Sequence, residues 1–370
     1  MKKYYTMTVR TLAPVHIGCG EQLTKIDYIY DEISRNVYIM HPRNLFQGLQ
    51  KQELLSVFEE KLICADKTFS LTRFIQAHQI PETVYSKWAK YSYPVNNVSV
   101  QNGQMEIHSF IKDAYNCPYI PGSGIKGALR TCIAYGVILR EIKQFEENAL
   151  NIEKSLKSAN RLREQDSLLK EKIFHISDRE NTFKSDIVND CMMHLQISDS
   201  KPLSPDCLTL CQKIDVDYDG NPHSLNLVRE CISPETEIVF DLAIDENFPF
   251  SVQEILGFVH NLFVDYDDLF RSKFKSEVTD TFHEPPEADE EYLYLGGGTG
   301  YPMKSILFSL YEDPERASQN AAVILETQFS KAGHQDFTER TGVSPKVWKC
   351  TRFNEQLYEM GLCTIKLEEK

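Results

Sequence analysis

The order of strand-like and helix-like segments constrains the fold of this chain most strongly. Residues 4–12 alternate apolar and polar side chains, as in a half-buried strand, and residues 26–40 predict a hairpin around a polar turn. Helical spacing follows over residues 43–58. From Met192 the strand pattern returns, and Ser251 begins a later helix with a capping-box pattern. This irregular order predicts an α+β domain rather than a regular parallel βαβ array.

The distribution of charge suggests how the 370 residues are divided. Residues 141–190 are rich in charges of both signs and carry only thinly spaced apolar residues. This pattern is typical of exposed helices, so we expect a helical insertion there. We therefore expect an N-terminal part of the core over 1–140, the insertion over 141–190, and a second β-rich part over 191–370 that completes the core.

Cysteine usage and hydropathy indicate a cytoplasmic protein. No apolar run approaches the roughly 20 residues needed to span a bilayer. The first residues also lack the apolar segment of a secretory signal. The ten cysteines are scattered and contain no CxxC pair, so we expect reduced, mostly buried thiols and no metal site.

Three glycine-rich segments stand out, at residues 15–21, 120–130 and 295–304. Glycine lets successive backbone N–H groups approach an anion without a Cβ in the way. The second segment also leads into a helix, whose first N–H groups, at 123–126, would point at the same spot as Lys126 and Arg130. Together these features describe a phosphate seat. The simpler alternative is that the glycines only make tight turns and helix caps.

The spacing of the glycines does not fit the common nucleotide-binding loops. GxxxxGK[ST] is absent, and Tyr301 breaks the GxGxxG spacing in the third segment. The net charge of −14 also argues against indiscriminate nucleic-acid binding, which usually needs a basic excess. Nucleic-acid binding therefore requires that basic groups line one groove while acidic groups face elsewhere. The candidate residues for such binding are His16, Gly18, Gly20, Gly122, Ser123, Gly124, Lys126, Gly127, Arg130, Gly296, Gly297, Gly298, Gly300, Tyr301 and Lys304.

Several of these motifs resemble a known family. PGSGIKGALR at 121–130 and GGGTGYP at 296–302 look like the central and C-terminal glycine-rich motifs of the RAMP proteins of CRISPR effector complexes. APVHIGCG at 13–20, LQISDS at 195–200 and the NLVREC run also resemble that superfamily. The combination is most similar to the subunit that caps the end of a type III-A (Csm) complex.

This resemblance implies both a fold and a function. The fold would be an α+β core like an RNA-recognition motif (ferredoxin-like), enlarged by insertions. The chain would be a non-catalytic subunit that binds the 3′ region of the guide RNA (crRNA) and supports its maturation and antiviral defence, with no cofactor. Its partners would be the guide RNA and possibly target RNA, adjacent RAMP backbone and small subunits, and possibly a host trimming nuclease. The aromatic signature of ordinary RNA-recognition motifs is missing, so we expect binding through loops and the RNA backbone.

An enzyme is the alternative, because some RAMP relatives cleave RNA. A metal-independent endoribonuclease that processes repeat RNA would use His16, beside the first glycine segment, in acid–base chemistry. A lone histidine near a loop is more often a core or hydrogen-bonding residue. Asp31 and Asp199 read as turn or cap residues. We therefore predict no catalytic residue.

Overall fold

A computed structural model gives the arrangement of the chain. It describes residues 2–64, 68–96, 105–158, 161–175, 189–278, 282–285 and 290–370. Among these residues, none of the helices combines the length and the hydropathy that a membrane span requires.

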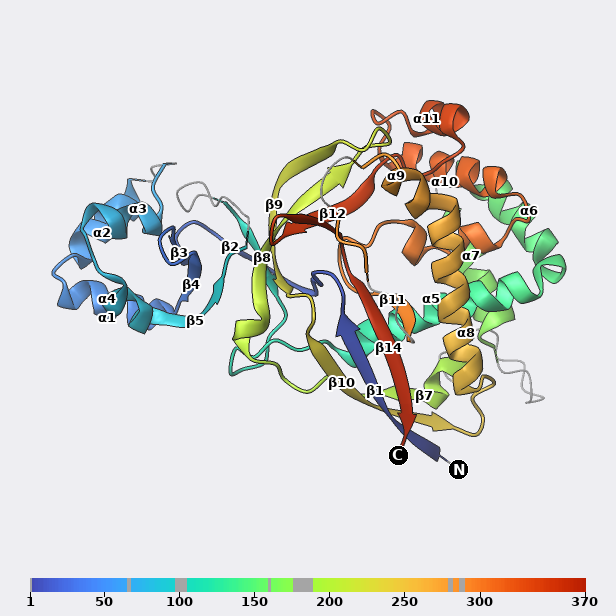
Figure 1. Cartoon of the computed structure of the whole chain (residues 1–370), viewed down its shortest axis with the longest axis horizontal. Helices are drawn as coiled ribbons and strands as arrows, with labels where there is room; N and C mark the ends of the chain where they lie inside the picture. Colours follow the sequence, from blue (N-terminus) through green and yellow to red (C-terminus); the bar gives the residue numbers. More distant parts are fainter. Residues whose placement is uncertain are drawn as a thin grey trace.

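The core of the main body is a five-stranded antiparallel sheet with strand order β11-β14-β1-β10-β7 (Figure 1). The strands are β1 (Lys2–Thr11), β7 (Leu195–Ile197), β10 (Glu237–Asp245), β11 (Glu291–Tyr294) and β14 (Leu362–Glu369). Helix α5 (Gly122–Arg140) lies between β1 and β7 in sequence, α8 (Val252–Tyr266) follows β10, and the two helices contact each other. Without its edge strand β11, this is a βαββαβ unit with the fourth, first, third and second strands side by side. The predicted α+β, ferredoxin-like core is therefore confirmed.

The predicted alternation in the first strand is also confirmed. Tyr5, Met7 and Val9 of β1 are buried, while the residues between them are more exposed. Ser251 and Glu254 form the predicted capping box at the start of α8, with each side chain bonded to the other residue's backbone N–H.

A second sheet of six strands, in the order β13-β12-β8-β9-β6-β2, was not predicted. The strands are β2 (Gly18–Leu23), β6 (Ile107–Phe110), β8 (Leu208–Val216), β9 (Pro222–Ile232), β12 (Trp348–Phe353) and β13 (Gln356–Glu359). Gly18 and Gly20 of the first glycine segment belong to β2, at the edge of this sheet, and not to a loop.

A small lobe extends from the main body on the β2 side (Figure 1). It contains the sheet of β3 (Tyr28–Asp31), β4 (Asn36–Met40) and β5 (Ala89–Pro94) and the helices α1 (Pro42–Lys51), α2 (Leu55–Ile63), α3 (Leu71–Ala77) and α4 (Glu82–Tyr85). The predicted hairpin is β3–β4. The helix predicted over 43–58 is instead two helices, because the chain turns at Glu53, whose φ is 58°. One face of the lobe's sheet joins the main core, and the other packs on its helices.

The charged segment after α5 is helical, as predicted, but it is not fully exposed. Helix α6 (Glu146–Ser155), helix α7 (Arg161–Ser167) and the π-helical turn η4 (Leu168–Ile173) follow the turn η3 (Ile142–Phe145). Phe145, Ile152, Leu156, Leu168 and Ile173 are buried in the main core. Residues 159–160 and 176–188 of the predicted insertion lie outside the described residues. The division at residues 140 and 190 stays a prediction.

The remaining helices lie towards the C-terminal part of the chain. They are the π-helical turn η8 (Asp267–Arg271), α9 (Ser272–Lys275), α10 (Pro314–Gln328) and α11 (His334–Thr341). Short 3-10 turns are η1 (Ser86–Trp88), η6 (Cys191–His194), η7 (Pro205–Cys207), η9 (Pro302–Lys304) and η10 (Leu307–Ser309).

All ten cysteines are free thiols; six are buried, but Cys19 and Cys64 are exposed.

Candidate nucleic-acid interface

The first and third glycine segments lie against each other at the junction of the two sheets. The Gly297 N–H donates to the His16 carbonyl oxygen at 2.8 Å. The turn between β13 and β14 joins them, because the Gly361 N–H donates to Pro14 O at 3.0 Å and its carbonyl accepts from Leu295 N at 2.9 Å. Three chain segments, around residues 14–16, 295–297 and 361, are therefore tied together by backbone hydrogen bonds.

Glycine is required at the centre of this junction. Gly296 has φ of 81°, and a Cβ built on it would lie 2.2 Å from the His16 carbonyl oxygen. Gly298 has φ of 101°, and its Cβ would lie 2.9 Å from Nη1 of Arg229. Residues that carry a Cβ rarely adopt such φ values, and here the Cβ would also collide with neighbouring atoms. The glycines of the third segment thus allow a close approach to both His16 and Arg229.

His16 is buried beneath this junction and is neutral at neutral pH. Its Nδ1 lies 2.7 Å from the Glu230 carbonyl oxygen, which can only accept, so Nδ1 carries the proton. Burial lowers the pKa of His16 to about 4, and the nearby charges of Arg229 and His108 add to this. Gly18 leaves room for the other ring nitrogen, since a Cβ there would lie 3.0 Å from Nε2.

Arg229 on β9 and Lys304 in η9 bring two positive charges to the third glycine segment; we call them the Arg229–Lys304 pair. The Lys304 ammonium donates to the Gly296 carbonyl oxygen at 2.8 Å. Burial lowers the pKa of Lys304, and repulsion from Arg229 lowers it further. Among the residues that the structure describes, no carboxylate oxygen lies within 4.0 Å, the limit for an ion pair, of the Arg229 or Lys304 nitrogens. An anion placed here would relieve the repulsion between the pair.

The neighbouring cations are arranged differently. Lys349 on β12 lies beside Gly300, whose Cβ would be 3.8 Å from the lysine Cγ. The Lys349 ammonium bonds both carboxylate oxygens of Asp215, at 2.8 and 2.9 Å, and Lys213 lies 3.9 Å from the same carboxylate. Asp215 therefore partly neutralises these two lysines, and the Arg229–Lys304 pair is the stronger anion site.

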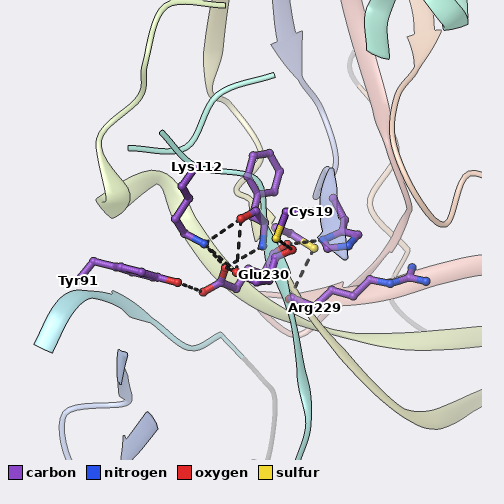
Figure 2. Close-up of polar contacts among 9 residues, drawn as sticks. Cys19, Tyr91, Lys112, Arg229 and Glu230 are labelled. Atoms are coloured by element: carbon purple, nitrogen blue, oxygen red, sulfur yellow. Dashed lines mark hydrogen bonds and ion pairs between the residues drawn. The ribbon is translucent and has the colours of Figure 1, made fainter. Parts of the chain in front are cut away.

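The side chain of Glu230 lies on the face of β9 opposite Arg229 and holds the strand in place (Figure 2). Its fully buried carboxylate forms an ion pair with Lys112 and accepts from Phe110 N at 2.8 Å and from the Tyr91 hydroxyl at 2.9 Å. Successive side chains of a strand point to opposite faces, so Arg229 extends away from this cluster (Figure 2). The carboxylate thus holds the β9 backbone in place. That backbone positions Arg229, and its carbonyl oxygen at Glu230 accepts the bond from His16.

The second glycine segment does not form the predicted phosphate seat. Helix α5 begins at Gly122 itself, and the Gly122 N–H donates to Asp199 Oδ1 at 2.8 Å. A carboxylate of the chain therefore occupies the start of the helix, where the sequence predicted a phosphate. Asp199, expected to be a turn or cap residue, thus bonds the start of α5 from 77 residues away. Gly122 also packs closely, because its Cβ would lie 2.4 Å from Ile197 O, whereas Gly124 and Gly127 face open space.

The two predicted basic residues of this helix are also partly neutralised. Nη1 of Arg130 lies 2.7 Å from Asp190 Oδ2, and its guanidinium lies 3.8 Å above the Phe174 ring. Burial lowers the pKa of Lys126, although the charge of Asp190 opposes this. Ser123 is exposed at the helix start. Helix α5 contacts η9, so the second segment borders the third without joining its backbone junction.

Sequence reasoning missed Arg229, Glu230, Lys112 and Tyr91. The motif NLVREC was noticed, but only the pairing of β9 with its neighbours shows that Arg229 and Glu230 face different environments. A charged pair between Leu227, Val228, Cys231 and Ile232, in the apolar half of the strand, is the signal that could have identified Arg229 and Glu230. Of the other predicted residues, Gly20 is exposed with φ of 87°, and Tyr301 is half-buried against the main core.

Comparisons with known proteins found relatives that match the chain over its whole length. "CRISPR system Cms protein Csm5" of Mycobacterium tuberculosis is 28% identical to the chain, covering 99% of it and 98% of the relative. The Csm5 protein of Enterococcus italicus is 24% identical over 100% of the chain and 98% of the relative. These proteins are similar to the chain along their whole lengths.

Two solved structures share the fold. The crystal structure of T. onnurineus Csm5 matches with a TM-score of 0.63 at 17% identity, covering 96% of this chain and 99% of that one. A chain of a Csm–crRNA–target RNA ternary complex from a type III-A CRISPR-Cas system matches with a TM-score of 0.59 at 18% identity, covering 99% and 100%. The family model of the RAMP superfamily matches residues 8–301, so the chain belongs to the RAMP superfamily.

Proposed function

We propose that the chain is a non-catalytic RNA-binding subunit of a type III-A CRISPR interference complex. It binds the 3′ region of the guide RNA at the end of the complex and supports maturation of that RNA and antiviral defence. The full-length similarity to Csm5 proteins supports the assignment to such a complex. The fold shared with a chain of the Csm–crRNA–target RNA complex is consistent with it.

The Arg229–Lys304 pair is the observation that carries the proposal. The chain has a net charge of −14, yet these two cations face a glycine-rich backbone without an ion-pair partner among the described carboxylates. A phosphodiester offers the acceptor oxygens and the charge that this arrangement lacks. Phosphate contacts of this kind position RNA without reading its bases, which suits a guide of variable sequence.

The assembly partners follow from the same assignment. Adjacent RAMP backbone subunits and small subunits of the complex would meet surfaces away from the Arg229–Lys304 pair. Target RNA and a host trimming nuclease are further candidate partners. The acidic remainder of the surface would keep the RNA confined to one path, because it repels phosphates elsewhere.

The buried environment of His16 weighs against the endoribonuclease alternative. A general base works best with a pKa near the working pH, whereas the pKa of His16 is about 4. Its Nδ1 proton is engaged by the Glu230 carbonyl oxygen. His16 therefore serves the proposed function as a structural residue that supports Gly297.

The test is to make Arg229→Ala with Lys304→Ala and to measure guide RNA occupancy and length in purified complexes. Because the two side chains would bind phosphates rather than bases, their removal should weaken binding for every guide sequence. It should also reduce the salt slope by about 0.7 for each phosphate that is no longer neutralised. The matched control is Lys126→Ala with Arg130→Ala, which removes the same number of charges from the partly neutralised second segment.

Two results would contradict the proposal. Unchanged guide occupancy and length in the Arg229–Lys304 variant would show that the pair does not hold the RNA. Cleavage of repeat RNA by the full chain in EDTA, abolished by His16→Asn, would favour the endoribonuclease instead.

A further inference from the structure

Glu359, at the end of β13, is a buried carboxylate with four hydrogen-bond donors. Its Oε2 accepts from Arg271 Nε at 2.9 Å and from the Tyr294 hydroxyl at 2.8 Å. Its Oε1 accepts from Trp348 Nε1 at 2.9 Å and from the Tyr266 hydroxyl. The residue is 3% exposed, so the protein replaces its hydration with these donors.

The four donors come from four different elements. Tyr266 ends α8, Arg271 ends η8, Tyr294 ends β11, and Trp348 begins β12. Burial, together with the charge of Glu359, holds the pKa of Tyr266 and of Tyr294 well above the usual value. Both hydroxyls therefore remain protonated donors. The carboxylate thus fixes β11 and β13 relative to the helical layer.

Both chain segments that leave this carboxylate enter the glycine junction directly. Tyr294 is followed by Leu295, which donates to Gly361 O at 2.9 Å, and then by Gly296. Glu359 is followed by Met360, whose Cβ and Cγ would lie 3.4 Å from a Cβ on Gly298. Tyr294 is therefore one residue, and Glu359 two residues, from the hydrogen-bonded backbone of the junction, so the bond between their side chains supports it.

We infer that Glu359 is a positioning residue for RNA binding. Its bond to Tyr294 fixes the position of the third glycine segment, so that the backbone of this segment lies beside the Arg229–Lys304 pair. Arg271 forms an ion pair with the carboxylate inside the core, and Trp348 and Tyr266 set its orientation. The RNA part of this inference rests on the proposed function, whereas the positioning of the segment does not.

The two tyrosines provide a matched test. Tyr294→Phe and Tyr266→Phe each remove one buried hydroxyl that donates to the same carboxylate. Only Tyr294 continues into the glycine segment, so the two variants should lose similar thermal stability but differ at the site. We expect Tyr294→Phe to weaken binding of a mixed-sequence single-stranded RNA by roughly 10-fold, because small misplacements of binding groups are costly. Tyr266→Phe should change it less than about 2-fold.

Amide hydrogen exchange of Leu295 and Gly297, measured on the full chain without RNA, is the second readout. Exchange should accelerate in Tyr294→Phe and stay as in the wild type in Tyr266→Phe. Equal effects of the two variants on RNA affinity and on exchange would overturn the inference. If the wild-type chain does not bind RNA, the proposed function fails, and the exchange comparison still decides whether Glu359 positions the segment.

Discussion

The third glycine segment and the second glycine segment use glycine for different purposes. In the third segment, left-handed φ angles at Gly296 and Gly298 let the backbone meet His16 and Arg229, and two cations are left without a carboxylate partner among the described residues. In the second segment, Gly122 packs against the backbone at Ile197 and its N–H is bonded to Asp199. Arg130 there is paired with Asp190.

This difference shows that a glycine-rich sequence beside a lysine and an arginine is not enough to make an anion site. What matters is whether the chain supplies its own carboxylates to the freed N–H groups and cations. Asp199 accepts from the N–H at the start of α5, and Asp190 pairs with Arg130 near the middle of the helix. The Arg229–Lys304 pair lacks such a residue within the described parts of the chain.

The largest expected effect comes from adding a methyl group to the third segment. Gly296→Ala should lower the free energy of unfolding by about 4 kcal/mol, because φ of 81° is unfavourable for alanine and the new Cβ would meet the His16 carbonyl oxygen. Urea unfolding measures this. A loss below about 1 kcal/mol would show that the junction can move apart, which would break the contrast with the second segment.

The pH dependence of stability should depend on His16. Its pKa is about 4 in the folded chain and about 6.5 when unfolded, so the unfolded state binds the extra proton between these values. Stability is therefore fully present above pH 6.5 and is lost as the pH falls towards 4, by about 3 kcal/mol from this group. In His16→Asn, unfolding between about pH 7 and pH 4 should show a loss smaller by that amount. An unchanged pH dependence would place His16 in a solvated site.

Removing the helix cap tests the second segment. Asp199→Ala should cost about 1–2 kcal/mol of stability, because the Gly122 N–H loses its acceptor. RNA affinity should stay within about 2-fold of the wild type, and Asp199→Asn should restore most of the stability. A tenfold change in affinity would mean that the start of α5 belongs to the RNA site after all.

The smallest effect should have the opposite sign. Gly124→Ala should raise the free energy of unfolding by about 0.5–1 kcal/mol, since alanine favours the helix and a Cβ there faces open space. RNA binding should not change. Weaker binding with raised stability would show that RNA approaches the α5 backbone at Gly124 closely.

Local patterns in the sequence predicted the local elements of the fold. The alternation of β1, the β3–β4 hairpin and the capping box of α8 each depend on residues close together in the chain. The six-stranded sheet could not be predicted in this way, because it joins strands from residues 18 to 359. The break at Glu53 was missed because its neighbours keep a helical spacing of leucines.

The candidate site was predicted only in part, for the same physical reason. The glycines of the first and third segments were identified, but their contact with each other comes from the pairing of β14 with β1 and β11 and from the turn at Gly361. The Asp199–Gly122 bond joins residues 77 apart, and no local pattern indicates it. The sequence does not show which face of β9 is buried. Arg229 was therefore not distinguished from its neighbour Glu230, which is buried on the opposite face.

Photo-crosslinking of the full chain to a single-stranded RNA that contains photoreactive uridines tests the central claim most directly. Mass spectrometry would locate the crosslinked peptides. We predict that they contain residues 16–20, Arg229 and the third glycine segment up to Lys304, and that Arg229→Ala with Lys304→Ala removes them. Crosslinks confined to residues 122–130 or to the small lobe would contradict the account.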